Sequence, residues 1–324
     1  MPKRTSLTAG AFQWACPVCR RSIDIDGENA CCKSCTSAFT RRNGIWHFLP
    51  DATAYEAFLK QYELVRRSEE WGRCDDAYYR ALPKVDGNDP NRRIWKVRAR
   101  TFRCFLLRIV MPMEGRIPLR VVDLGAGNGW LAYRLALRGH RVAAVDLRID
   151  DFDGLGAHVH YDADYFPVRA EYERLPFTDG GFDLATFNAS LHYAEDTRAV
   201  LHEALRVLRP GGKLVLLDSP VYPYELAGRE MVRKRESELL SRCGFASNAL
   251  KSENFFTHAR LGDLAREADI TWSIIHPHLG VRRAVRSLTA RITGEHPPAD
   301  FPVLSAEKRP VDEAVDFISR EEVV

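Results

Sequence analysis

Three glycines at alternating positions could bring backbone close to a small ligand: Gly125, Gly127 and Gly129. They lie between a short apolar stretch at 121–124 and a helical pattern, and such a turn lets the chain approach a ligand closely at a helix N-terminus. Asp146 comes 21 residues after Gly125, where a second apolar stretch ends. A carboxylate there can accept hydrogen bonds from both hydroxyls of a ribose. These residues predict a binding site for a cofactor that contains a nucleoside.

Three features of the sequence distinguish between the cofactors that bind to such a turn. Dinucleotide-binding loops place glycine or alanine at the sixth position for close packing of helix on sheet, whereas this chain has Trp130. No Lys-Ser or Lys-Thr pair follows the glycines, as a P-loop requires. More than 110 residues precede the loop, whereas dinucleotide domains often begin near it. We therefore favour S-adenosylmethionine (SAM) over NAD.

Two Cys-x-x-Cys pairs near the N-terminus supply a second kind of chemistry. Four thiolates presented on two tight turns form the tetrahedral set that structural zinc prefers. The metal would also supply folding energy to a segment too short for a large core. The predicted ligands are Cys16, Cys19, Cys32 and Cys35. Cys31 could replace Cys32. The set has no open position, so we expect the zinc to be structural rather than catalytic.

The elements that must position these residues change in character near residue 120. From about 51 to 110 apolar residues recur at three- and four-residue steps, which predicts helices. From 120 to 218 short apolar strands alternate with helices, which indicates a parallel sheet covered on both faces. The predicted fold class is α/β, with a Rossmann-like, doubly wound, mostly parallel seven-stranded sheet. A small zinc ribbon and a helical segment precede this sheet. Residues 270–275 and 301–304 are expected to pair as late strands.

These patterns divide the chain into four parts. We assign 1–50 to the zinc ribbon, 51–115 to a helical lid or linker, 116–306 to the cofactor-binding domain and 307–324 to a charged tail. Inserted helices are predicted at about 222–268 and 280–294.

Apolar content of 45%, charged content of 28% and a net charge of +3 are ordinary for a globular protein. No apolar run approaches the ~20 residues that span a membrane, and no signal-peptide core follows the N-terminus, so we expect a cytoplasmic protein.

A series of motifs between 171 and 214 is similar to that of a known family. In order they are Glu-Tyr-Glu-Arg-Leu-Pro-Phe-Thr-Asp-Gly-Gly-Phe-Asp from Glu171, Leu-His-Tyr from Leu191, and Leu-Arg-Val-Leu-Arg-Pro-Gly-Gly-Lys-Leu from Leu205. Together with the glycine loop they resemble the class I methyltransferases, a family that includes the quinone-biosynthesis C-methyltransferases. The resemblance covers about residues 119–219 and implies a SAM-dependent methyltransferase.

The resemblance also implies which residues bind the cofactor. Asp123 and the glycine loop would hold the methionine end of SAM, and Asp146 would bind the ribose. Glu171 stands where the family usually has an aspartate that reaches the adenine amino group, and Tyr172 replaces a residue that is commonly alanine. Asp123 could instead be a strand-end cap, and Glu171 a solvated surface residue. The full predicted set is Asp123, Gly125, Ala126, Gly127, Asn128, Gly129, Asp146, Leu147, Glu171, Tyr172 and Asn188.

Candidate catalytic residues follow the predicted fourth strand, at the open end of the sheet. They are Asn188, His192 and Tyr193. Because SAM brings its own electrophile, the protein mainly has to align a nucleophile, and a general base helps when that nucleophile carries a proton. His192 could equally line the pocket or have a structural role. The run from Asn188 to Leu191 differs from the Asn/Asp-Pro-Pro-Tyr element of amino-base methyltransferases, so we do not expect DNA as a partner.

Three hypotheses about the function remain open, and two of them differ in the methyl acceptor. The ribbon and its exit at 44–50 resemble the zinc segment of bacterial 23S rRNA guanine methyltransferases, which contacts RNA. Arginines near 20, 41, 92–100 and 282 could track a phosphate backbone, but we interpret them as solvated faces because the net charge is small. We therefore favour a small-molecule acceptor, with rRNA or tRNA base methylation as the alternative. An inactive methyltransferase-fold scaffold is the third hypothesis, which the intact glycine loop and Asp146 disfavour.

Overall fold

The computed structural model describes residues 11–73, 75–115, 118–245, 251–277 and 297–310. Its main sheet contains β1 (Asp24–Asp26), β2 (Asn29–Cys31), β3 (Ala38–Arg42), β4 (Ile45–His47), β5 (Arg120–Leu124), β6 (Arg141–Asp146), β7 (Phe166–Arg169), β8 (Phe182–Asn188), β9 (Leu208–Leu217), β12 (Ser273–Ile275) and β13 (Val303–Glu307). The α-helices are α1 (Glu56–Ser68), α2 (Asp76–Ala81), α3 (Arg92–Phe105), α4 (Met111–Met113), α5 (Trp130–Ala136), α6 (Thr197–Val207), α7 (Glu225–Cys243) and α8 (His258–Glu267). A separate parallel pair joins β10 (Val221–Tyr222) to β11 (Phe256–Thr257).

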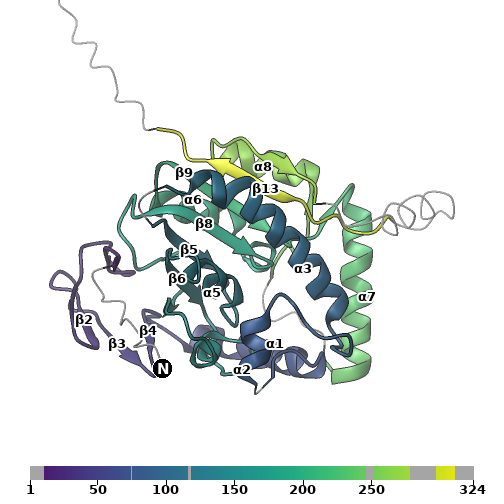
Figure 1. Ribbon diagram of the computed structural model, residues 1–324, viewed down its shortest axis with the longest axis horizontal. Coiled ribbons are helices and arrows are strands. Elements are labelled where there is room, and N and C mark those ends of the chain that lie inside the picture. The colour runs from purple at the N-terminus through teal and green to yellow at the C-terminus, as the bar shows by residue number, and fades with distance from the viewer. Residues whose placement is uncertain (1–10, 74, 116–117, 246–250, 278–296, 311–324) are drawn as a thin grey trace, which may run out of the picture.

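The prediction of seven strands was wrong, because the sheet in the described part of the chain has eleven. Their order is β1-β2-β3-β4-β7-β6-β5-β8-β9-β13-β12. Seven of these strands form the doubly wound unit, and the four ribbon strands extend its edge through the parallel pairing of β4 with β7. Figure 1 shows these ribbon strands beyond β6 at one end of the molecule, while α8 and β13 lie toward the other end. The sheet has four extra strands because the edge of β4 hydrogen-bonds to β7, so the ribbon does not form a separate sheet.

Apolar strands buried on both faces explain the layered core. Along β5, Val122 and Leu124 pack into one apolar cluster while Val121 packs into the other, as the period-two geometry of a strand requires. Helices α6 and α8 contribute to the first cluster, and α3 and α5 contribute to the second. The predicted α/β class is therefore confirmed, with helices on both faces of a mostly parallel sheet.

Several predicted elements occur with small shifts. The helix expected at 92–110 is α3, which continues as a π-helical turn over Leu106–Val110. The late strands pair as expected, with β12 antiparallel to β13. The third strand of the doubly wound unit ends at Arg169, so Tyr172 lies in the loop that follows it. The predicted helix at 280–294 lies outside the described residues, as does the tail from 311. Among the helices that the structure describes, none is both long and apolar enough to cross a membrane.

The strand order reverses between β6 and β8, which are the two neighbours of β5. In open parallel sheets this switch point leaves a crevice at the carboxyl ends of the strands, where ligands bind. The loop that carries the three glycines leaves β5 at this edge. Residues of α1, α3 and α7 line a cavity at the same edge. Figure 1 shows these three helices on one side of the molecule.

Candidate cofactor site and metal centre

The glycine loop turns sharply between β5 and α5. Gly125, Gly127 and Gly129 have φ angles of 75°, 54° and 79°, a backbone region that favours glycine. A Cβ on Gly125 would lie 2.2 Å from the Cβ of Ser190, and one on Gly129 would lie 2.1 Å from the hydroxyl of Tyr165. Any larger residue would therefore both strain the turn and displace a neighbour.

Asp146 is fixed by the backbone on either side of the crevice. Its carboxylate accepts hydrogen bonds from the amides of Gly127 and Arg148, each at 2.8 Å. Burial raises the pKa of Asp146, and the two amides oppose that rise by stabilising the charged form. The carboxylate is thus oriented beside the glycine loop by the residues that the ligand would also contact.

Two buried acceptors lie at the ends of the central strands without hydrogen-bond partners. Asp123, at the end of β5, accepts a hydrogen bond from the hydroxyl of Thr186 at 2.8 Å through Oδ1, but its Oδ2 has no partner within the described residues. Burial raises the pKa of Asp123 to about 7. The Oδ1 of Asn188, at the end of β8, is also buried and unpaired. Buried acceptors are normally satisfied, so this pair is suited to a donor from a ligand.

A cavity of about 780 Å³ covers this edge of the sheet, which is within the usual range for small-molecule sites. It brings together most of the predicted residues: Gly125, Ala126, Gly127, Asn128, Asp146, Leu147, Tyr172, Asn188, His192 and Tyr193. Three predicted residues do not line it. Asp123 is fully buried and Gly129 faces Tyr165. Glu171 is half-buried, and its burial raises its pKa, which Arg174 lowers and Asp51 raises further.

His192 and Tyr193 form a short turn after β8 on the cavity wall. Nδ1 of His192 lies 3.2 Å from the hydroxyl of Ser219, and the Tyr193 hydroxyl accepts a hydrogen bond from Arg235 at 3.3 Å. Burial, with smaller contributions from Arg235 and Arg98, lowers the pKa of His192 to about 3. The imidazole is therefore neutral at any pH near 7.

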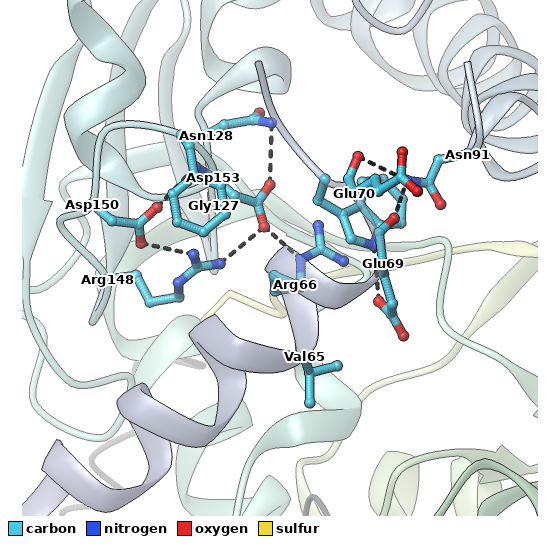
Figure 2. A network of polar contacts seen from close by, with 12 residues as sticks. Val65, Arg66, Glu69, Glu70, Asn91, Gly127, Asn128, Arg148, Asp150 and Asp153 are labelled. Carbon is cyan, nitrogen blue, oxygen red and sulfur yellow. Dashed lines mark hydrogen bonds and ion pairs between the residues drawn. The ribbon is translucent and has the colours of Figure 1, made fainter. Parts of the chain in front are cut away.

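A charged network that the sequence did not reveal joins α1 to the glycine loop (Figure 2). Asp153 lies 2.5 Å from Nε of Arg66 and 2.9 Å from Nη1 of Arg148, and all three side chains are largely buried. Asn128 of the loop donates a hydrogen bond to the other Asp153 oxygen at 3.4 Å. Arg66 and Asp153 are 87 positions apart, and no local pattern links them.

Arg98 is a second cavity residue that the sequence analysis missed. It belongs to the arginine cluster interpreted as a solvated face, and for Arg98 that interpretation was wrong because α3 turns its side chain toward the cavity. Its guanidinium lies 5.2 Å from the ring centre of Trp71 and 4.9 Å from that of Trp95, and its Nε is buried without an acceptor. Burial lowers the pKa of Arg98, and Asp218 is the main charge that opposes this effect.

The four predicted cysteine ligands converge in the ribbon. Their Sγ atoms all lie within 4.8 Å of one another, with Cys16–Cys35 at 3.5 Å and Cys19–Cys32 at 3.4 Å. Zn–S bonds of about 2.3 Å in a tetrahedron place sulfurs about 3.8 Å apart, so the set fits zinc. Cys31 is exposed and Cys32 is buried, and it is Cys32 that joins the cluster.

The part of the chain that forms the crevice is similar to known proteins. A family model described as the methyltransferase domain matches residues 122–216, which run from β5 through the glycine loop into β9. This part of the chain is therefore similar to a methyltransferase domain. The match contains Asp123, the glycine loop, Asp146 and the turn with His192.

Curated relatives are similar over parts of the chain. It is 28% identical over 178 residues to 27-O-demethylrifamycin SV methyltransferase of Amycolatopsis mediterranei, which covers 52% of this chain and 65% of that protein. It is 31% identical over 165 residues to malonyl-[acyl-carrier protein] O-methyltransferase of Hahella chejuensis, which covers 46% and 59%. With demethylmenaquinone methyltransferase of Clavibacter sepedonicus it shares 32% over 143 residues, covering 44% and 53%. The chain thus spans less than two thirds of each relative.

A solved structure is also similar to this chain, at lower identity. The 1,6-didemethyltoxoflavin-N1-methyltransferase of Burkholderia thailandensis is 19% identical with a TM-score of 0.47. That comparison covers 86% of this chain and 98% of the other.

Proposed function

We propose that this chain is a SAM-dependent methyltransferase that acts on a small-molecule acceptor. The observation that carries the proposal is the position of Asp146, which the amides of Gly127 and Arg148 hold beside the glycine loop at the switch point of the sheet. A carboxylate in this position can bind ribose hydroxyls, and the methyltransferase domain match agrees with SAM as the source of that ribose.

The unsatisfied polar groups of the cavity correspond to the charged groups of SAM. We assign the methionine ammonium to the unpaired Oδ1 of Asn188, which lines the cavity at the end of β8. Asp123 is fully buried and does not line the cavity, so its contact with the methionine end stays a prediction. We assign the methionine carboxylate to the guanidinium of Arg98, whose buried Nε has no hydrogen-bond acceptor among the described residues. Leu147 and Tyr172 would flank the adenine. Contact between Glu171 and the adenine amino group stays a prediction.

The bound cofactor supplies an electrophilic methyl group, so the protein contributes mainly alignment and exclusion of water. Aromatic and apolar side chains from Phe58, Tyr62, Met231 and Phe301 form cavity walls that suit the body of a small organic acceptor. His192 is neutral, so the ring can accept a hydrogen bond from the acceptor but is a weak proton acceptor at neutral pH. We therefore assign His192 and Tyr193 to orienting the nucleophile.

We further propose that the helices of 51–115 act as a lid and that the Cys₄ cluster holds structural zinc. Helix α1 contributes four cavity residues and is tied to the cofactor edge through Arg66 and Asp153. The four thiolates of the ribbon leave no position for a substrate on the metal.

The acceptor class can be tested with methyl-labelled SAM. The protein would be incubated separately with a small-molecule extract of a bacterial culture and with total RNA from the same cells. We expect label in the organic-soluble products and background label in the RNA. Label that enters RNA alone would contradict the proposed acceptor class.

A further inference from the structure

The first zinc knuckle carries an arginine that leaves the ribbon. Arg20 directly follows the ligand Cys19, has a φ of 67°, and donates its amide hydrogen to the carbonyl of Cys16 at 2.8 Å. This turn closes the Cys16–Cys19 knuckle. The Arg20 side chain points away from the sulfurs, toward the methyltransferase domain. Its guanidinium binds the Glu203 carboxylate at 2.5 Å and the carbonyl of Glu173 at 2.9 Å.

Glu203 connects that arginine to the loop after β7. It lies on α6, its side chain is 6% exposed, and its Oε1 also accepts a hydrogen bond from the amide of Leu175 at 2.7 Å. Arg206 on the same helix binds the other oxygen at 2.8 Å. The carboxylate is therefore fully engaged, and Arg20 is its only partner in the ribbon among the described residues.

The loop held in this way is the one that reaches the cofactor cavity. It starts after Arg169 at the end of β7, and Tyr172, one residue before Glu173, lines the cavity. The ribbon also pairs with the far end of this loop through its backbone. The amide of Ala15 donates to the carbonyl of Pro176, and the amide of Thr178 donates to the carbonyl of Gln13, both at 3.1 Å. The ribbon thus holds residues 173–178 directly by the Arg20 bond to the Glu173 carbonyl, by a side-chain bond between Thr178 and Gln13 at 3.3 Å, and by two backbone bonds. It also holds them indirectly, because Arg20 binds Glu203, which accepts the amide of Leu175.

We propose that Arg20 is a positioning residue through which the Cys₄ knuckle sets the adenine side of the cofactor cavity. Without a metal the four thiols are no longer held together, so the turn that carries Arg20 is less firmly fixed. The 171–175 loop would then keep its bonds to Glu203 and Arg206 of α6 but lose its side-chain bond to the ribbon. Occupancy of the metal site would therefore raise the affinity for the cofactor, and by linkage the cofactor would slow loss of the metal. The inference rests on the proposed function for the identity of the ligand.

The test compares two neighbouring arginines on the same knuckle. Arg20→Gln removes the guanidinium, and Arg21→Gln is the matched control because Arg21 is exposed and has no side-chain bond in the described part of the chain. Arg20→Lys restores a cation of similar reach. For each variant one measures zinc per chain, the dissociation constant of S-adenosylhomocysteine (SAH) by calorimetry, and hydrogen exchange of residues 171–178.

We expect one zinc per chain in all variants, with SAH affinity about threefold to tenfold weaker in Arg20→Gln. Exchange at 171–178 should be faster in that variant alone, and Arg20→Lys should recover part of both effects. In the unaltered protein, saturating SAH should slow the transfer of zinc to a chelator. Equal SAH affinity and equal exchange in Arg20→Gln and Arg21→Gln would overturn the inference. Failure of the unaltered protein to bind SAH would instead count against the proposed function, and the exchange comparison would still judge the contact.

Discussion

Asp123 combines two properties that seldom occur together: full burial and an oxygen without a donor. Its pKa of about 7 in the folded chain lies above the unfolded value of 3.8. The folded state therefore holds a proton that the unfolded state has released, and the resulting stabilisation is complete below about pH 4 and is lost as the pH rises through 7. We propose that an ammonium group of the ligand would stabilise the ionised Asp123 carboxylate and so offset this loss of stability.

Asp123→Asn tests that arrangement. Asparagine keeps an acceptor for Thr186 and cannot ionise, so the ligand-free variant should gain stability relative to the unaltered protein as the pH rises from 4 to 8. The expected gain at pH 8 is on the order of 1–4 kcal/mol in the free energy of unfolding. SAH affinity should fall. Thermal unfolding across this pH range measures the first effect, and a stability difference that does not change with pH would contradict the account.

His192 gives a prediction about activity. Because its pKa is about 3, the imidazole does not change charge between pH 5 and 8. The profile of kcat/KM against pH in this range should have the same shape in the unaltered protein and in His192→Gln, although the variant is expected to be slower. An inflection near pH 6.5 that disappears in the variant would show that His192 titrates in the working enzyme.

The residues that local patterns could identify are those whose chemistry depends on near neighbours in sequence. The glycines predict a turn, Asp146 was predicted at the end of a strand, and the cysteine pairs predict a metal site. Arg98 and Asp153 carried no such pattern. Arg98 looked like one of several charges on an exposed helix, and only the packing of α3 against Trp71 shows that its side chain reaches the cavity. Long-range packing, which the sequence does not display, decides such cases.

At the scale of elements, α1 is held to the sheet by charge as well as by apolar contact. Arg66 is 12% exposed and Asp153 is 5% exposed, and the pair is buttressed by Arg148 and Asn128 (Figure 2). Removal of one partner leaves the other charge buried, which makes such pairs sensitive to substitution. The helix was predicted from its apolar spacing, but its attachment point was not.

Arg66→Gln should loosen α1 without unfolding the domain, because Asp153 keeps Arg148. We expect a loss of about 1–3 kcal/mol in stability, faster hydrogen exchange over 56–68, and weaker SAH binding. Lys60→Gln, an exposed change on the same helix, serves as the control. Unchanged exchange in Arg66→Gln would show that apolar contacts alone hold α1.

At the scale of the whole molecule, the ribbon and the doubly wound unit share one sheet and one core. Trp14 stacks on Phe48 of the ribbon exit and also packs on Phe177, which precedes β8 of the doubly wound unit, with ring centres 5.2 Å apart in both pairs. The sequence separated these parts because their composition differs. The pairing of β4 with β7 joins residues more than 100 positions apart, which local patterns do not encode.

This continuity predicts that the metal stabilises more than the ribbon. Cys32→Ser should lose zinc and lower the unfolding temperature of the whole chain in one transition, because the shared core is damaged from one side. Cys31→Ser removes the adjacent exposed thiol and should leave both zinc content and unfolding unchanged. Two separate unfolding transitions, with the later one unaffected by Cys32→Ser, would show that the ribbon is energetically independent.

The central claim is that SAM binds at the switch point with its ribose on Asp146. The most direct measurement is calorimetric titration of SAH into the unaltered protein, Asp146→Asn and the exposed neighbour variant Asp151→Asn. The account predicts one SAH per chain in the unaltered protein and in Asp151→Asn, and binding at least about tenfold weaker in Asp146→Asn. No binding heat in the unaltered protein, or equal affinity in all three, would contradict it.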